Sequence, residues 1–142
     1  MTREQRLEVA NNIIKAIASC GRRFLSMNSD RTGEPDPDAR VSRFVFINKR
    51  LHYLDKYTEA LIFVHYEFRT RGGWGHQFSD GGTLLCLMQH MRDFIVKGEP
   101  ININYFGPWP KWVCGGDLWG YGAAMPLLRA KVEDILQNAN HS

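Results

Sequence analysis

Three apolar runs separated by short turns decide the fold: VSRFVFI at 41–47, LHYLDKY at 51–57 and ALIFVHYEF at 60–68. The first of them is rich in β-branched and aromatic residues, which favour strands. The connections between them suit hairpins and are too short for the crossovers that parallel strands need. The runs therefore predict an antiparallel meander. Because ALIFV at 60–64 is apolar throughout, we expect it at the centre of the sheet, covered on both faces or by a second subunit.

A helix is predicted before the meander. Thr2 and Gln5 match the capping-box pattern T-x-x-Q at its start, and Gly21 supplies its stop. Apolar residues recur at helical spacing on the face that we expect to be buried, namely Leu7, Ala10, Ile13, Ile14 and Ile17. The following stretch, NSDRTGEPDPDAR at 28–40, is turn-forming throughout and predicts an exposed loop.

Two further helices are predicted after the meander. The first follows FSDGGT at 78–83 and ends at Gly98 and Pro100. Its apolar stripe consists of Leu84, Leu87, Met88, Met91, Phe94 and Ile95. We also place Cys86 on this apolar face, as a buried structural thiol. The last helix is expected to start near Pro126, with an inward face of Met125, Leu128, Val132, Ile135 and Leu136. Between them, ININY at 101–105 can add a fourth strand.

The predicted order is α-β-β-β-α-(β)-α. This is an α+β fold in which three helices pack on an antiparallel meander of three to four strands. The length of 142 residues fits one domain, spanning 1–142. Hydrophobic residues make up 44% and charged residues 23%, a globular composition that excludes disorder as the main state. No apolar run is long enough to span a bilayer and the charged N-terminus is no secretory signal, so we expect a soluble cytoplasmic protein without membrane contact.

The most unusual stretch is YFGPWPKWVCGGDLWGYG at 105–122, here called the aromatic segment. It holds three of the four tryptophans together with five glycines and two prolines. Exposed aromatic rings are costly, so the segment must pack on the protein body, a ligand or a partner. Its tryptophans either complete the core, or Trp109, Trp112 and Tyr121 form a surface that stacks on a base or contacts a protein. We expect Trp109 to be exposed, because prolines flank it, and Trp119 to be buried.

A second candidate site precedes the second predicted helix. The stretch FSDGGT at 78–83 leaves first-turn amides uncovered, which together with the helix dipole can bind an anion. The residues of this amide cup are Ser79, Gly81, Gly82 and Thr83. Upstream, a glycine-rich loop carries four residues that could close over the anion, namely Arg69, Arg71, Trp74 and His76. The alternative is a simple helix cap beside a solvated loop.

Other chemistries are poorly supported. The phosphate-binding pattern GxxxxGK[ST] is missing, and the three cysteines have no zinc-ligand spacing. Cys114 is the only plausible nucleophile, with His65, His76 or His90 as its base, and nothing in the sequence brings them together. We therefore predict no catalytic residues, no cofactor and no metal. The net charge of +3 suits an anionic partner but is too small for a dedicated nucleic-acid binder.

The two unusual stretches also carry a resemblance. FSDGGTL at 78–84, a helix and then GPWPKWVCGGDLWGYG at 107–122 resemble a family of small uncharacterised proteins encoded by tailed phages and prophages. The resemblance extends over residues 41–136. It implies a phage accessory protein that acts on host machinery, including immunity, in the cytoplasm of the host cell, and it implies no particular activity.

We therefore expect a non-catalytic phage accessory protein that counteracts a host immune system by sequestering an anionic, nucleotide-like small molecule. The amide cup would hold a phosphate and the aromatic segment would stack on the base. The alternative is an inhibitor that blocks a host defence or metabolic protein through the aromatic segment, and the third candidate is a weak nucleic-acid binder. A homo-oligomer would suit sequestration, since shared pockets bury more of a small ligand. Aromatic side chains around a concavity would favour the ligand, and a flat patch would favour the protein partner.

Overall fold

The computed structural model describes residues 1–19, 26–27, 40–56, 58–66, 78, 83–112, 116 and 122–140. The helices and strands in chain order are α1 (Arg3–Ser19), β1 (Ser26–Met27), β2 (Arg40–Val41), β3 (Arg43–Ile47), β4 (Arg50–Asp55), β5 (Ala60–Phe63), α2 (Thr83–Arg92), the π-helix η3 (Asp93–Lys97), the 3-10 helices η4 (Ile103–Phe106) and η7 (Gly122–Ala124), and α3 (Met125–Asn140). The predicted α+β fold, with three α-helices and a three-stranded antiparallel meander, is confirmed. The strands β1 and β2 form a separate antiparallel pair that the sequence did not predict.

The sheet has the order β3-β4-β5, so β4 is its central strand. Tyr53 of β4 lies opposite Phe44 of β3 on one side and Ile62 of β5 on the other. The prediction that residues 60–64 form the central strand is therefore wrong, because β5 is an edge strand in the described part of the chain. Its side chains Leu61 and Phe63 are 51% and 39% exposed. The apolar composition of a run of residues does not reveal how many strands flank it.

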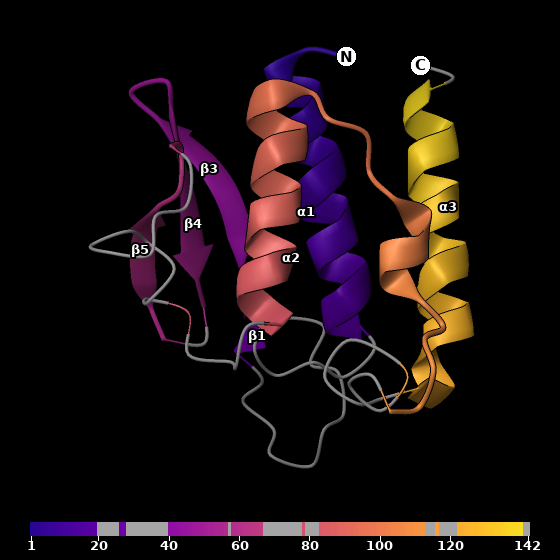
Figure 1. Cartoon of the computed structure of the whole chain (residues 1–142). Coiled ribbons are helices and arrows are strands. Elements are labelled where there is room, and N and C mark those ends of the chain that lie inside the picture. Colours follow the sequence, from indigo (N-terminus) through magenta and orange to yellow (C-terminus); the bar gives the residue numbers. More distant parts are fainter. Residues whose placement is uncertain are drawn as a thin grey trace.

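The helices form two layers beside the sheet (Figure 1). α1 and α2 lie against one face of the sheet, and α3 packs against α1 on the side away from the sheet. The predicted capping box starts α1: the amide of Thr2 donates to Oε1 of Gln5 at 2.8 Å, and the amide of Gln5 donates to Oγ1 of Thr2 at 3.1 Å. These bonds satisfy donors that have no partner within the helix.

The predicted apolar stripes make the core. All six residues of the second stripe are buried, from Leu84 to Ile95, and they meet buried residues of α1, of the sheet and of α3 in one cluster. Cys86 is exposed, which corrects its predicted burial. It follows Leu84 by two residues, or about 200° around a helix, and this rotation turns it away from the core.

The end of the second helical region and the turn after it are fixed by specific contacts. After α2 the chain continues as η3, and Gly98 ends this π-helix with φ of +74°. The Nε of Arg6 donates to the carbonyl of Ile95 at 3.0 Å, which ties η3 to α1. Farther on, the side chain of Asn102 accepts a bond from the amide of Asn104 at 3.0 Å and starts η4. The predicted strand at 101–105 is therefore wrong, because this asparagine caps a helical turn.

Candidate functional site

Most of the predicted binding residues lie outside the described residues. These are Arg69, Arg71, Trp74, His76, Ser79, Gly81, Gly82 and Tyr121, and the same holds for Cys114 and Trp119. Thr83 is described as the first residue of α2. The predicted site residues whose side chains the structure describes are Trp109 and Trp112, so the aromatic segment is the candidate site that can be built from its residues.

The aromatic segment begins with aromatic rings that pack against one another. Phe106 is fully buried and anchors η4 in the core. Tyr105 beside it stacks on His90 of α2, with ring centroids 5.0 Å apart and planes 11° apart, and meets Trp109 edge-on at 5.8 Å. Burial lowers the pKa of His90, and its Nε2 accepts the amide of Asn102 at 3.3 Å. A neutral ring is what this acceptor role requires.

Trp109 is half-buried and packs against the core, so the prediction that it is the exposed tryptophan is wrong. Its indole nitrogen donates to the carbonyl of Asn104 at 3.1 Å, and its amide donates to the carbonyl of Gly116 at 2.8 Å. Gly107 between them has φ of +82°, a conformation that favours glycine. The flanking prolines restrict the backbone at Trp109, but they do not decide what its ring packs on.

Trp112 has the largest exposed fraction of the described large apolar side chains, at 85%. It lies in a turn with Lys111, which is also exposed. The two described tryptophans therefore differ in burial, and Trp112 rather than Trp109 is the exposed one. A tryptophan held almost entirely in water offers a large apolar area to whatever binds there.

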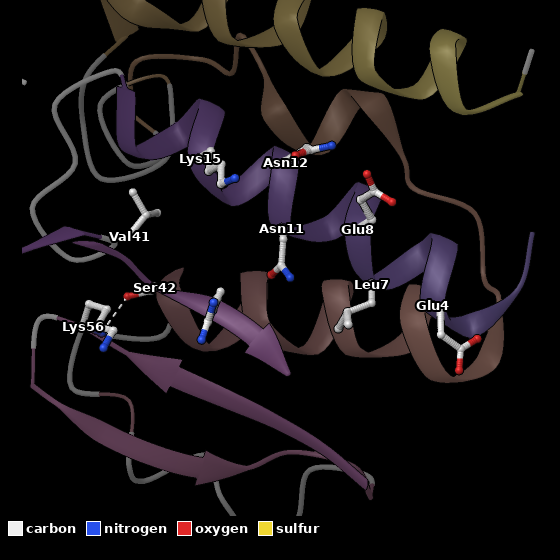
Figure 2. A pocket seen from close by; sticks show the side chains of 10 residues that line it. Glu4, Leu7, Glu8, Asn11, Asn12, Lys15, Val41, Ser42 and Lys56 are labelled. Atoms are coloured by element: carbon white, nitrogen blue, oxygen red, sulfur yellow. Dashed lines mark hydrogen bonds between the residues drawn. The ribbon is translucent and has the colours of Figure 1, made fainter. Parts of the chain in front are cut away.

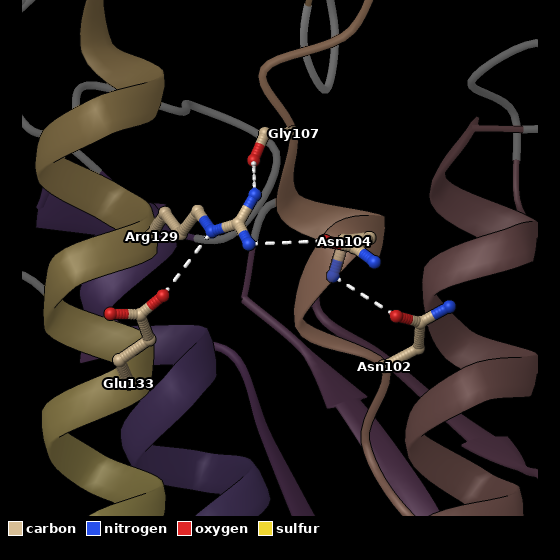
Figure 3. A network of polar contacts seen from close by, with 5 residues as sticks. All are labelled: Asn102, Asn104, Gly107, Arg129 and Glu133. Carbon is tan, nitrogen blue, oxygen red and sulfur yellow. Dashed lines mark hydrogen bonds and ion pairs between the residues drawn. The ribbon is translucent and has the colours of Figure 1, made fainter.

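One guanidinium holds the start of the segment in place (Figure 3). Arg129 of α3 donates from Nη1 to the carbonyl of Gly107 at 2.8 Å and from Nη2 to Oδ1 of Asn104 at 3.0 Å. Its Nε donates to Glu133 one turn along α3, at 3.2 Å. Sequence analysis missed this role of Arg129. The only sequence signal is its i,i+4 spacing from Glu133, which does not identify contacts more than 20 residues away.

A cavity of about 640 Å³ lies elsewhere, between α1 and the start of β3 (Figure 2). The residues that line it are Glu4, Leu7, Glu8, Asn11, Asn12, Lys15, Val41, Ser42, Arg43 and Lys56. Lys15 and Lys56 lie toward Val41 at one end, and Glu4 and Glu8 lie toward the other end near Leu7. The cavity therefore has a cationic and an anionic end. Neither of the two described tryptophans lines it, and its residues are too far apart in sequence to form a motif.

His65 makes structural contacts through both its ring and its main chain. It is buried, its Nδ1 accepts the amide of Leu51 at 3.0 Å, and its carbonyl accepts two bonds from Arg92, from Nε at 3.2 Å and from Nη2 at 3.0 Å. Burial lowers the pKa of His65, and the nearby cations Arg50 and Arg3 lower it further. The neutral ring is therefore part of the junction between β4 and α2.

The described part of the chain contains no group of three His, Cys, Asp or Glu residues placed to hold a metal ion. None of its helices has the length and apolar character of a membrane span.

The comparison with known proteins assigns the chain to a family. The model of the YoqU family matches residues 1–138, and the chain therefore belongs to this family. No curated protein and no solved structure matches the chain.

Proposed function

We propose that this member of the YoqU family is a non-catalytic accessory protein of phage origin that binds and blocks a protein of the host cell, in the host cytoplasm, through its aromatic segment. The phage setting is supported by the resemblance of FSDGGTL at 78–84 and GPWPKWVCGGDLWGYG at 107–122 to phage and prophage proteins. The single observation that carries the binding mode is the 85% exposure of Trp112 on a segment held by the rest of the molecule.

The free energy gained by burying the ring of Trp112 supports its role as the main contact to a protein partner. Tryptophan is enriched among the few residues that dominate protein–protein binding, because burying its ring removes a large apolar area from water. Arg129 and the Trp109–Asn104 bond fix the segment before Trp112, so little conformational entropy is lost on binding. Neither Trp109 nor Trp112 lines the cavities beside α1, which favours a protein partner over stacking inside a described pocket.

The test compares Trp112→Ala with the wild type. Host proteins captured by the wild-type chain are identified by mass spectrometry, purified and titrated calorimetrically. Trp112→Ala is expected to weaken binding by about thirtyfold, which corresponds to about 2 kcal/mol, without changing the melting temperature. Leu127→Ala is the matched control, since Leu127 of α3 is 58% exposed and lies outside the segment. Equal affinity of Trp112→Ala and wild type would remove the segment from the contact.

Sequestration of an anionic, nucleotide-like small molecule is the second candidate function. The observation that favours it is the cationic end of the cavity beside α1, where Lys15 and Lys56 lie, together with Arg43 in the cavity lining. A volume of about 640 Å³ is in the usual range for small-molecule sites. The amide cup at Gly81 and Gly82 is the alternative place for the phosphate.

Native mass spectrometry of protein purified from a phage-susceptible host tests this second candidate, because a retained ligand adds a defined mass. Lys15→Gln with Arg43→Gln is expected to release a ligand held in the cavity, and Gly82→Asp is expected to release one held by the amide cup. Trp112→Ala separates the two functions, since it affects partner binding and leaves a ligand in the cavity. A spectrum of unliganded chain at physiological salt contradicts sequestration.

A further inference from the structure

The two edges of the sheet differ. The edge of β3 is closed by a side chain of α1: the amide of Phe44 donates to Oδ1 of Asn11 at 2.7 Å, and Nδ2 of Asn11 donates to the carbonyl of Phe44 at 2.9 Å. One asparagine thus takes the place of a neighbouring strand. Edges covered in this way are protected from pairing with another chain.

The edge of β5 is open in the described part of the chain. The amide of Val64 donates to the carbonyl of Leu51 at 3.0 Å, which fixes the alternation of the ladder between β4 and β5. Ile62 therefore directs its main-chain groups toward β4, while Leu61 and Phe63 direct theirs away from it. The sheet continues to no further strand among the described residues. Leu61 and Phe63 also expose their apolar side chains, at 51% and 39%.

We propose that β5 is the dimerisation strand of this protein, and that it pairs antiparallel with β5 of a second copy about a two-fold axis at Ile62. This places Leu61 of each copy opposite Phe63 of the other. Both residues offer an outward amide and carbonyl, so the pair forms reciprocal main-chain bonds. The apolar side chains on the outer face of the sheet then meet across the axis, and two three-stranded sheets become one.

Charge complementarity selects a second copy as the occupant. Glu59 immediately precedes β5, and its side chain is 54% exposed although its carboxylate lies 3.9 Å from Nζ of Lys56, a long surface ion pair that contributes little. At the other end of β5, the guanidinium of Arg50 lies 5.3 Å from the ring centroid of Tyr66. Antiparallel pairing brings the start of one β5 beside the end of the other, so Glu59 of each copy approaches Arg50 of the second copy. The acidic side chain thus lies at the start of β5 and the basic side chain lies on β4 beside the end of β5, as a contact between two identical copies requires.

The pairing is short, since β5 has four residues. Stable dimers commonly bury about 800 Å² per partner, and a four-residue ladder with a few side chains falls below this value. We therefore expect a reversible dimer whose population rises with protein concentration. The contact is independent of the proposed host partner, because α3 and η4, at the start of the aromatic segment, lie on the side of α1 away from the sheet (Figure 1).

Sedimentation velocity and native mass spectrometry across a wide range of concentrations test the proposal. The wild type is expected to show a monomer–dimer equilibrium. Leu61→Pro removes an outward amide and leaves the ladder with β4 intact, so it is expected to raise the dimer dissociation constant about tenfold or more. Far-UV circular dichroism reports whether this variant keeps its fold.

A charge swap tests the same contact without a change in the backbone. Glu59→Arg and Arg50→Glu are each expected to weaken the dimer, and the double variant is expected to restore it. Arg43→Glu is the matched control, because it changes the net charge as Arg50→Glu does but lies on β3. A wild type that stays monomeric overturns the proposal, as does a dimer that none of these variants weakens. If the wild type is monomeric and Leu61→Pro no longer captures the host protein, the β5 edge binds a different protein. This result would also overturn the proposal.

Discussion

The neutral imidazole of His65 makes folding stability depend on pH. Its pKa is lowered in the folded state from an ordinary value of 6.5, mainly by burial. Between the two pKa values the unfolded chain binds more protons than the folded chain, so stability falls as the pH falls. The stability that the neutral ring contributes is present above about pH 6.5 and is lost as the pH drops through the folded-state pKa.

The variant His65→Asn isolates this effect. The shorter side chain keeps an acceptor near Nδ1 for the amide of Leu51 and has no proton to gain. We expect it to be less stable than wild type at neutral pH, because it fills less of the site. Its urea midpoint should fall less steeply than that of wild type between about pH 7 and pH 5. Parallel pH profiles for the two proteins would contradict the role assigned to His65.

Alanine substitution of the two described tryptophans should change the free energy of unfolding by different amounts. Trp109 is half-buried and donates a hydrogen bond to Asn104, so we expect Trp109→Ala to cost about 2 kcal/mol or more. Trp112 is 85% exposed, and Trp112→Ala should stay within about 0.5 kcal/mol of wild type. Urea denaturation of both variants measures the difference. Equal losses would show that Trp112 has a structural role.

Two glycines with positive φ make a further matched pair. A Cβ on Gly107 would lie 2.7 Å from Cε of Met125, whereas one on Gly98 would meet only the guanidinium of Arg6, at 3.6 Å. Gly98, with φ of +74° and ψ of +19°, is in the left-handed helical region, where alanine is strained by about 1–2 kcal/mol. Gly107, with φ of +82° and ψ of −163°, is in a region that essentially only glycine adopts. Gly107→Ala should be the less stable of the two, because it also crowds a fully buried methionine. Equal urea midpoints would mean that Met125 moves freely.

At the scale of the elements, Asn11 joins α1 to β3. Asn11→Ala leaves the amide and the carbonyl of Phe44 without these partners, and we expect a loss of about 1–3 kcal/mol. Asn12→Ala is the control, because Asn12 lines the cavity beside Asn11 and makes no bond to the sheet in the described part of the chain. Chemical denaturation compares them, and sedimentation reports whether the uncovered β3 edge starts to aggregate.

Sequence periodicity predicted the elements because burial repeats along a helix and along a strand. The stripe from Leu84 to Ile95 follows one helix face, and the structure buries it as expected. Placement of the elements could not be predicted in the same way. The apolar run at 60–64 suits a central strand as well as an edge strand, and the neighbours of β5 decide between them. At 101–105 a local bond from Asn104 to Asn102 outweighs a weak strand propensity.

The sequence predicts which segment forms the candidate site, but it does not predict how the side chains of that segment are arranged. Composition identified residues 105–122 as unusual, but which tryptophan is exposed depends on contacts with distant residues. Arg129 lies 22 residues beyond Gly107 in the sequence, and it holds that carbonyl at 2.8 Å. Lys15 and Lys56, which line the cavity beside α1, are likewise far apart in the sequence. Contacts of this range follow from the packing of α1 and α3, which a single sequence does not specify.

For the whole molecule, the two proposed contact surfaces lie on different sides. β5 forms one edge of the sheet, and α3, which holds the aromatic segment, packs beyond α1 (Figure 1). A dimer through β5 would therefore carry two copies of Trp112 and leave α3 and η4, which hold the start of the aromatic segment, uncovered. Two anchors on one particle raise the apparent affinity for a partner that is itself multimeric or dense on a surface. Leu61→Pro would lower this avidity while leaving the affinity of each single site unchanged.

Unfolding of this protein is expected to be cooperative. Buried residues of α1, the sheet, α2, η4 and α3 form one cluster, and Phe106 couples the start of the aromatic segment to it. We therefore expect unfolding in a single transition, seen at the same urea concentration by far-UV circular dichroism and by tryptophan fluorescence. Leu87→Ala or Met91→Ala, each removing a fully buried side chain from α2, should cost about 2–5 kcal/mol. Both signals should shift together to lower urea, because the loss is shared by the whole core. If the fluorescence transition of either variant keeps the wild-type midpoint while the dichroism transition moves, the aromatic segment unfolds separately and its anchoring through Phe106 is refuted.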